Sequence, residues 1–332
     1  MSAAPPSSAL SDLIIVDVHL GPGELAGAMR EEARQGLTAT PKTLSPKWLY
    51  DEAGCQLFDE ITRLDEYYPT RREREILAAR AGEIAEATGA DTLIELGSGT
   101  SEKTRLLLDA FAAAGTLRRF IPFDIAEPTL RSAAAAVAEE YPGTAVHAVV
   151  GDFGRHIGHL PEGGQRLVAF LGSTIGNLDA AERRRMFGEI AANLGPGDSF
   201  LLGCDLVKDV ARLEAAYNDA LGVTAAFNLN ILSALNRALD ARFDPELFSH
   251  VASWDAEAEW IDLRLRAEAR HTVAIHGLGL EIGFEEGEEV RTEISAKFRP
   301  EKMAVELEQA GFRVGRFFTD AGNDFGLFLA FR

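Results

Sequence analysis

Five short apolar runs that alternate with helical stretches constrain the fold of this 332-residue chain more than any other feature. The runs lie at residues 92–96, 119–123, 145–150, 167–171 and 199–203. Two parallel strands need a crossover connection, usually a helix, so this alternation is typical of a parallel sheet covered by helices. The sequence therefore predicts an α/β fold built on a doubly wound sheet.

The alternation stops after the fifth run and resumes near the end of the chain. Residues 209–239 have the pattern of long helices, and apolar and polar residues alternate within residues 254–285. Strict alternation indicates half-buried antiparallel strands rather than another strand–helix unit. A helix over residues 300–310 and apolar runs at 312–318 and 325–331 then return to the sheet pattern.

This interruption predicts a second, smaller α+β domain for substrate binding. It would consist of residues 19–70 and 208–296, and the sheet domain of residues 71–207 and 297–332. Residues 1–18 begin with a Pro- and Ser-rich stretch and are predicted to be a disordered tail. The second domain is expected over the carboxyl edge of the sheet, where folds of this kind bind ligands.

The charge balance limits the class of partner. The chain has 33 basic and 52 acidic side chains, a net charge of −19, and such a surface repels phosphate backbones. No nucleic acid is therefore expected. No run of about 18 apolar residues is present, so no membrane partner is expected either.

The cysteines and histidines indicate the compartment and argue against a metal. Cys55 and Cys204 are too few for a disulfide framework, and the N-terminus lacks a secretory signal, which together favour the cytoplasm. His156 and His159 lie close in sequence, but no Cys or carboxylate cluster completes a ligand set. We expect a cytoplasmic monomer without a metal.

A glycine turn and two aspartates predict a nucleoside site. The turn Gly97-Ser98-Gly99 ends the first run, where glycine lets the backbone approach a ligand, and Glu102 replaces the third glycine of the dinucleotide fingerprint. Asp124 ends the second run, and Asp152-Phe153 follows the third. Each aspartate alone suits a turn or cap. Together they favour an adenosine without phosphates that carries a positive sulfonium.

Three further segments are candidates for the acceptor side. Asn177 follows the fourth run, where it would bind an amine or a carboxylate, or cap the next helix. Tyr67 lies at the proposed domain junction, a place where clefts form. Glu293 and Ser295 alternate on one strand face, which is either a clamp for an imidazole N–H or a solvated surface.

Several long strings resemble one family, the bacterial histidine Nα-methyltransferases of ergothioneine biosynthesis. The most specific are IELGSGTSEKT at 94–104, FLGSTIGN at 170–177 and EYYPTR at 66–71. Residues 36–42, 46–48, 61–64, 222–228 and 297–301 extend the resemblance to about nine-tenths of the chain. It implies a Rossmann-like class I methyltransferase sheet. It also implies transfer of three methyl groups from S-adenosylmethionine to L-histidine, giving hercynine.

The resemblance also implies residue roles. On the donor side, Tyr50 and Lys103 would hold the methionyl carboxylate, Gly97 and Ser98 the turn, Asp124 the ribose, and Asp152 and Phe153 the adenine. On the acceptor side, Tyr67 and Asn177 would engage the α-amino group, Asn177 and Tyr217 the carboxylate, and Glu293 and Ser295 the imidazole, with Phe58, Gly172, Thr224 and Leu263 lining the pocket. Tyr67 and Asn177 would be the catalytic residues.

One departure from the family pattern concerns specificity. Leu263 and Arg264 stand where relatives have Met and Trp. Leucine roughly conserves the volume of methionine, so the same substrate is expected. The alternatives are a methyltransferase of another amino acid or small amine, and a protein that senses the donor without catalysis.

Overall fold

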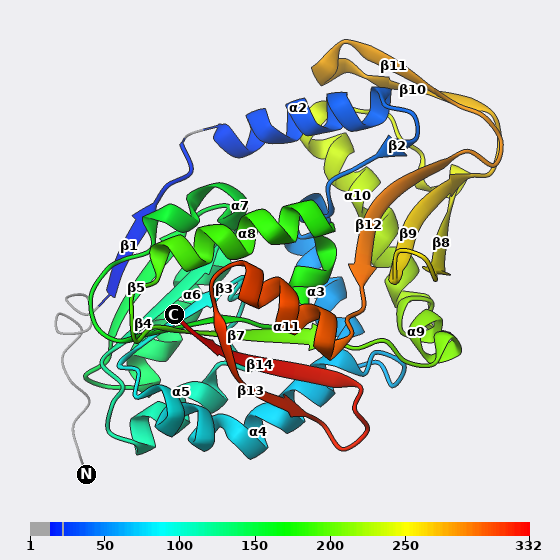
Figure 1. Ribbon diagram of the computed structural model, residues 1–332. Helices are drawn as coiled ribbons and strands as arrows, with labels where there is room; N and C mark the ends of the chain where they lie inside the picture. Colours follow the sequence, from blue (N-terminus) through cyan, green and yellow to red (C-terminus); the bar gives the residue numbers. More distant parts are fainter. Residues whose placement is uncertain (1–13, 22) are drawn as a thin grey trace.

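An eight-stranded mixed sheet forms the centre of the larger part of the molecule in the computed structural model, which describes residues 14–21 and 23–332 (Figure 1). Its order is β1-β5-β4-β3-β6-β7-β14-β13. The strands are β1 (Ile14–Val18), β3 (Thr92–Leu96), β4 (Arg119–Asp124), β5 (Ala145–Val150), β6 (Arg166–Phe170), β7 (Ser199–Asp205), β13 (Arg313–Thr319) and β14 (Phe325–Phe331). Strands β1, β3, β4, β5, β6 and β7 pair in parallel, and β14 is antiparallel to both β7 and β13.

Helices cover both faces of this sheet, which confirms the predicted doubly wound α/β fold. They are α4 (Pro69–Thr88), α5 (Arg105–Ala113), α6 (Glu127–Glu140), α8 (Ala180–Asn193) and α11 (Pro300–Gln309), with the short α7 (Phe153–His156). Alternate residues of the strands pack against α4, α5 and α6 on one face and against α8 and α11 on the other. Because both faces are covered, β3, β6 and β7 are buried along their whole length.

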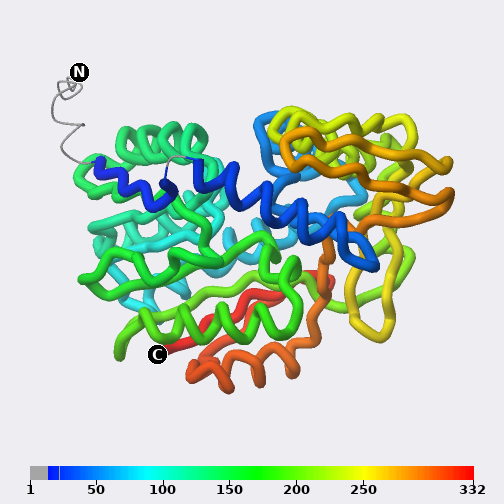
Figure 2. Tube along the Cα trace, turned by 90° about the horizontal axis from the view of Figure 1, so that it is seen from above, coloured from blue at the N-terminus to red at the C-terminus, as the bar shows by residue number. Residues whose placement is uncertain are grey.

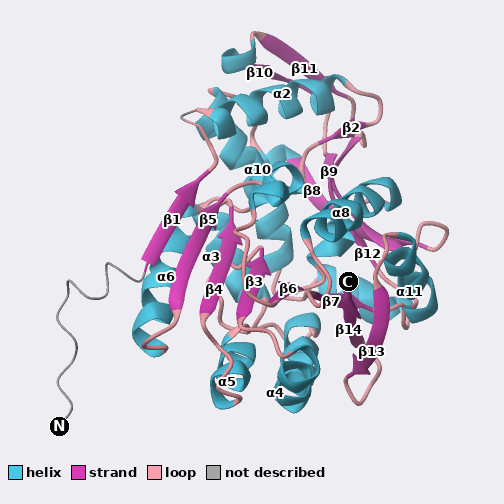
Figure 3. Ribbon diagram, turned by 60° about the vertical axis from the view of Figure 1, so that its left-hand side comes forward, coloured by secondary structure: helices cyan, strands magenta, loops and turns pink. Residues whose placement is uncertain are grey.

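A second, smaller α+β part lies beside the carboxyl ends of the parallel strands (Figure 3). Its sheet has the order β2-β12-β9-β8, and a separate hairpin pairs β10 with β11. The strands are β2 (Lys42–Thr43), β8 (Phe248–Asp255), β9 (Trp260–Ala267), β10 (His271–Ile275), β11 (Leu280–Phe284) and β12 (Glu289–Ala296). The helices are α2 (Glu24–Thr38), α3 (Glu52–Ile61), α9 (Val210–Tyr217) and α10 (Val223–Leu239).

One apolar cluster joins the N-terminal and the inserted segments of this second part. It contains buried side chains from Ala33 to Tyr68 and from Leu213 to Val290, apart from the two clusters of the main sheet. The long helix α2 runs from the main sheet toward the second part (Figure 2). The domain boundaries given above stay a prediction, which this separate cluster supports.

One local expectation was wrong. Residues 14–18 are not a tail but form β1, because a run of β-branched residues pairs along the edge of β5; residues 1–13 lie outside the described part. The helix that follows the glycine turn begins only at Arg105, because Gly97, Gly99 and Ser101 adopt positive φ and extend the turn. In the described ranges no helix is long and apolar enough to cross a membrane.

Short 3-10 helices complete the described chain. They are η1 (Pro46–Leu49), η2 (Ile157–His159), η3 (Thr174–Asn177), η4 (Pro245–Leu247) and η5 (His276–Leu278). Of these, η3 follows β6 and meets β12 of the second part. Because of this contact, the loop after β6 lies between the two parts of the molecule.

Candidate active site

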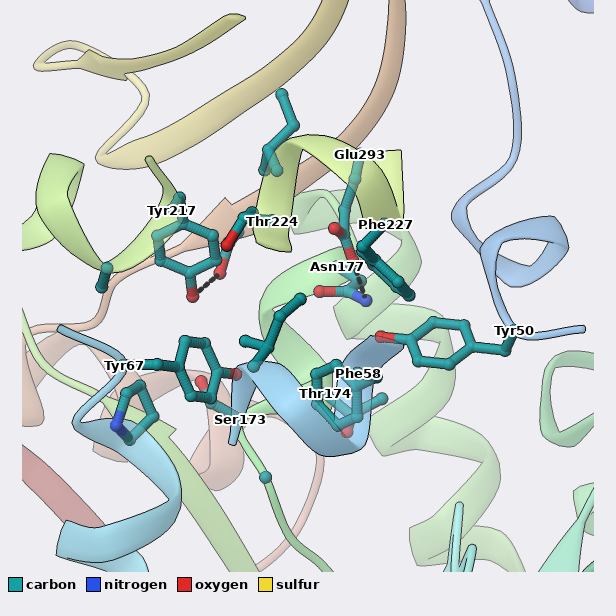
Figure 4. Close-up of a pocket in the computed structure, with 16 residues that line it drawn as sticks. Tyr50, Phe58, Tyr67, Ser173, Thr174, Asn177, Tyr217, Thr224, Phe227 and Glu293 are labelled. Atoms are coloured by element: carbon teal, nitrogen blue, oxygen red, sulfur yellow. Dashed lines mark hydrogen bonds between the residues drawn. The ribbon is translucent and has the colours of Figure 1, made fainter. Parts of the chain in front are cut away.

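A pocket between the two parts collects most of the residues predicted for the acceptor (Figure 4). It is lined from α3, the residues before α4, the loop and η3 after β6, α9, α10, β9 and β12. The lining residues are Tyr50, Phe58, Ile61, Tyr67, Pro69, Gly172, Ser173, Thr174, Asn177, Ala216, Tyr217, Thr224, Phe227, Leu263, Glu293 and Ser295. All nine predicted acceptor residues are in this set.

Asn177 and Glu293 are joined across the pocket. The Asn177 Nδ2 donates to Glu293 Oε1 at 2.8 Å, so the amide oxygen of Asn177 is left to accept from a ligand (Figure 4). The alternative that Asn177 caps α8 does not hold, because Asp179 accepts from Ala181 and Glu182 and forms the capping box. Sequence spacing could not distinguish two candidate caps only two residues apart.

Burial changes the ionisation of Glu293. It raises the pKa of this carboxyl to about 7, although the Lys297 ammonium and the Asn177 amide both favour the charged form. An imidazole has an ordinary pKa of about 6.5, so the two groups are matched for sharing a proton near neutral pH. The other alternative for Glu293, a solvated strand face, is excluded because the side chain is buried.

Tyr217 and Ser295 form a hydroxyl pair at another side of the pocket. Their oxygens are 2.8 Å apart, and Lys297 donates to each of them at 2.7 Å. The sequence reasoning missed Lys297. The signal was present, because residues 293, 295 and 297 alternate and therefore extend along the same face of β12 and its continuation.

Aromatic rings form the wall between these polar groups. Tyr50 packs edge-on against Phe58 and Phe227 at 5.5 and 5.4 Å between ring centroids, and Tyr67 lies 6.0 Å from Tyr217. The hydroxyls of Tyr50 and Tyr67 point into the pocket (Figure 4). Burial raises the pKa of both phenols well above the usual value, so they stay protonated at neutral pH.

Two more lining residues bear on specificity. The Thr224 hydroxyl is buried without a hydrogen-bond partner in the described residues, so a ligand can satisfy it. Leu263 is buried in the pocket wall. Arg264, its neighbour on β9, forms ion pairs with Asp262 and Glu289 and does not line the pocket.

Five of the predicted donor residues lie at the carboxyl ends of β3, β4 and β5, whereas Tyr50 lines the acceptor pocket. Asp124 accepts from the Gly99 N–H at 2.8 Å, and a Cβ placed on Gly97 would lie 3.9 Å from the Phe153 ring. Asp152 caps α7 and accepts from Lys47 at 3.3 Å. The Ser98 hydroxyl is buried with no partner in the part of the chain that the structure describes, as expected of a turn that receives a polar ligand.

Lys103 lies between the donor turn and the acceptor pocket. Its ammonium pairs with Glu73, whose other oxygen accepts from the Gly172 N–H at 2.7 Å. A Cβ on Gly172 would lie 3.4 Å from Lys103 Nζ. Glu73 was not predicted, since nothing in its helix pattern separates a buried glutamate from an exposed one.

Comparison with known proteins identifies the family. A family model described as a histidine-specific, SAM-dependent methyltransferase matches residues 29–332. The histidine N-alpha-methyltransferase of Mycolicibacterium smegmatis is 56% identical over 314 residues, which cover 95% of this chain and 98% of the relative. The same enzyme of Mycobacterium tuberculosis is 53% identical, over 94% of this chain and 97% of the relative.

A more distant relative has a different acceptor in its name. The 4-dimethylallyltryptophan N-methyltransferase of Claviceps purpurea is 26% identical over 344 residues, covering 95% of this chain and 98% of the relative. The family model and the two full-length histidine N-alpha-methyltransferases agree with the resemblance predicted from the sequence. The chain belongs to the histidine-specific, S-adenosylmethionine-dependent methyltransferase family.

Proposed function

We propose that this enzyme transfers three methyl groups from S-adenosylmethionine to the α-amino nitrogen of L-histidine, giving hercynine, the first step of ergothioneine biosynthesis. The observation that most supports histidine as the substrate is the hydrogen bond between Asn177 and Glu293. It places an amide oxygen that can accept from an amine beside a buried carboxylate in the same pocket. High identity over almost the whole chain to two histidine N-alpha-methyltransferases supports it.

The residues at the carboxyl ends of β3, β4 and β5 fit the donor. When bound there, S-adenosylmethionine supplies an electrophilic methyl group on a sulfonium. We assign Asp124 to the ribose, Asp152 and Phe153 to the adenine, and Gly97 and Ser98 to the turn. Lys103, with Tyr50, is assigned to the methionyl carboxylate, and its place beside Gly172 supports this because Gly172 lines the acceptor pocket.

The acceptor residues prepare the amine. The Asn177 carbonyl and the Tyr67 oxygen accept N–H bonds, which turns the nitrogen lone pair toward the donor and excludes other orientations. Tyr67 stays protonated at neutral pH because burial raises its pKa. It therefore orients the amine, and it can take a proton from the amine only if it gives up its own hydroxyl proton. A trimethylated nitrogen has no N–H left to donate, and the loss of these bonds favours release.

The other residues of the acceptor pocket are assigned to parts of histidine by the hydrogen-bonding atoms that have no partner in the protein. Glu293 and Ser295 are assigned to the imidazole, Tyr217 to the carboxylate, and Phe58, Gly172, Thr224 and Leu263 to the shape of the pocket. A purely apolar amino acid would leave the second oxygen of Glu293, the one that Asn177 does not contact, without a partner, which is costly in a buried site. This arrangement favours histidine over other amino acids.

The first experiment follows methyl transfer by mass. Purified enzyme is incubated with the donor and, separately, with each of the twenty amino acids. A gain of three methyl groups on histidine alone is expected. Transfer to another amino acid alone would overturn the substrate, and donor binding by calorimetry without any transfer would favour a sensor.

We also propose that the enzyme works as a monomer in the cytoplasm. Both cysteines are free thiols, as is usual in a reducing compartment. Light scattering coupled to size-exclusion chromatography tests the first part, with a mass near 36 kDa expected from the 35.9 kDa chain. A mass of twice that value would contradict it.

A further inference from the structure

A fully buried lysine lies directly behind the hydroxyl pair of the pocket. The ammonium of Lys297 has three N–H groups, and it contacts Asp205 Oδ2 at 2.9 Å, Tyr217 Oη at 2.7 Å and Ser295 Oγ at 2.7 Å. These three acceptors use all three donors. Lys297 itself does not line the pocket, so it can affect a substrate only through its partners.

The hydrogen bonds fix which proton faces the substrate. Tyr217 and Ser295 each accept from Lys297, and their oxygens are 2.8 Å apart, so one of their two hydroxyl protons lies between them. The second hydroxyl proton has no acceptor within the Tyr217–Ser295 pair. Because the Lys297 ammonium lies on the side of the pair away from the pocket, this O–H faces the pocket, which both residues line.

The charge behind this donor is positive. Asp205 is buried and also pairs with Lys208, and it accepts from the Tyr68 hydroxyl at 2.9 Å. Burial alone would raise the pKa of Asp205, but Lys297 and Lys208 outweigh it and hold the pKa below its usual value. Two ammonium groups therefore share one carboxylate, but only the Lys297 ammonium contacts the hydroxyl pair, so its charge is the one that acts on Tyr217 and Ser295.

We propose that Lys297, anchored by Asp205, is a positioning residue: it holds Ser295 as a donor to Tyr217, so that the Tyr217 hydroxyl donates to the carboxylate of the substrate and Ser295 keeps a lone pair for the imidazole. The site has an acidic side at Glu293 and a positively backed side at Tyr217, which matches an amino acid with a basic ring and an anionic carboxylate. This inference rests on the proposed function. It adds the residue by which the enzyme prefers an amino acid over the amine that lacks its carboxylate.

The test compares L-histidine with histamine, which has the same ring and amine but no carboxylate. Dissociation constants of both are measured by calorimetry for the wild type and for Lys297→Met. The wild type is expected to prefer histidine. In the variant this preference should fall by about 10- to 100-fold, the range for losing a hydrogen bond that involves a charged group. The affinity for histamine should change little.

Lys208→Met is the matched control. Lys208 contacts the same Asp205 but bonds to Tyr68 and to the Leu206 carbonyl instead of the hydroxyl pair. Its loss should lower the unfolding temperature and leave the preference for histidine unchanged. An equal fall in preference in both lysine variants would overturn the proposal, as would a loss of affinity for histidine and histamine by the same factor in Lys297→Met.

A second substitution covers the case in which Lys297→Met does not fold. Lys297→Gln keeps a neutral N–H donor toward Asp205 or the hydroxyls, and its preference for histidine should still fall because the charge is gone. A preference equal to that of the wild type would overturn the role of the cation. The proposed function fails separately, by the absence of methyl transfer from the wild-type enzyme to histidine.

Discussion

Asn177 and Glu293 show how one hydrogen bond sets the roles of two residues. The carboxylate takes the N–H side of the amide, so the oxygen of the amide faces the ligand. Glu293 in turn has one oxygen left for the imidazole. A buried carboxyl is costly without partners, and this cost is the source of its raised pKa.

Replacement of Glu293 by Gln should stabilise the fold while weakening histidine binding. A group whose folded-state pKa is raised from 4.5 to about 7 contributes stability below pH 4.5 and loses it as the pH rises through 7. Glu293→Gln should therefore raise the free energy of unfolding at pH 8 by about 1–3 kcal/mol. Denaturant titrations at pH 8 and pH 5 measure this. A gain that is larger at pH 5 would contradict it.

The histidine KM should depend on pH through the same residue. Below about pH 6.5 both the carboxyl and the free imidazole become protonated, and a neutral carboxyl is a poor partner for a cationic ring. The KM for histidine is expected to rise on this acid side, while the KM for the donor stays flat. Glu293→Gln should remove the part of this rise that the carboxyl causes and leave only the part caused by the free imidazole. If the pH profile of the histidine KM were the same in the variant, a group other than Glu293 would be responsible for it.

Tyr67→Phe tests the orientation of the amine. Loss of the hydroxyl should lower kcat for each methylation by about 10- to 100-fold with little effect on the donor KM, because the lone pair is no longer aligned. Tyr141→Phe is the control, since its hydroxyl bonds to Asp109 away from the pocket. Equal rates for wild type and Tyr67→Phe would refute the role.

At the scale of elements, the approach of η3 to β12 holds the pocket together. A Cβ on Gly176 would lie 2.9 Å from the Ala296 carbonyl oxygen, so the backbones meet at a distance that only glycine allows. Asn177 follows directly, and its bond to Glu293 spans the same contact. The geometry of the acceptor site thus depends on a backbone contact between the two sheets.

Gly176→Ala should therefore damage activity through the backbone. It is expected to cost roughly 1–3 kcal/mol of stability by overpacking and to lower kcat/KM for histidine more than donor affinity. Gly188→Ala is the control, because Gly188 lies inside α8 with no atom within 4 Å of a new Cβ. It should stabilise by about 0.5–1 kcal/mol without a kinetic effect. Thermal unfolding and steady-state kinetics check both.

The elements show where sequence reasoning succeeds and where it ends. The apolar runs of β3 to β7 were located to within about two residues because burial on both faces leaves a continuous apolar pattern. β1 was missed, since a short run next to a Pro- and Ser-rich start has the composition of a tail. Lys297 continues the alternation of Glu293 and Ser295, but its partner Asp205 lies on β7, and no sequence pattern shows that these two residues pair.

At the scale of the whole molecule, the acceptor pocket connects both parts. Thr174 to Asn177 come from the main sheet, and Glu293 and Ser295 from the second one. A ligand that bonds to both restrains their relative movement. Its effect should therefore extend beyond the atoms that it touches.

Saturating L-histidine should slow amide hydrogen exchange in both η3 and β12. Ligand at 100 times its dissociation constant stabilises the bound form by about 2.7 kcal/mol, which is enough for a clear change in exchange. Exchange measured by mass spectrometry on peptides from both segments tests this, with α5, none of whose residues lines the pocket, as the reference. Protection confined to one of the two segments would contradict a ligand that bridges them.

The split origin of the second apolar cluster also affects how the chain is made on the ribosome. Its first members, up to Tyr68, leave the ribosome long before Leu213 and the residues that follow, with the parallel strands β3 to β7 synthesised between them. At about 5–20 residues per second this interval lasts roughly 7–30 s. During that time Leu37, Trp48 and Leu49 have no apolar partners from the insert, so nascent chains paused after β7 are expected to be substrates for chaperones.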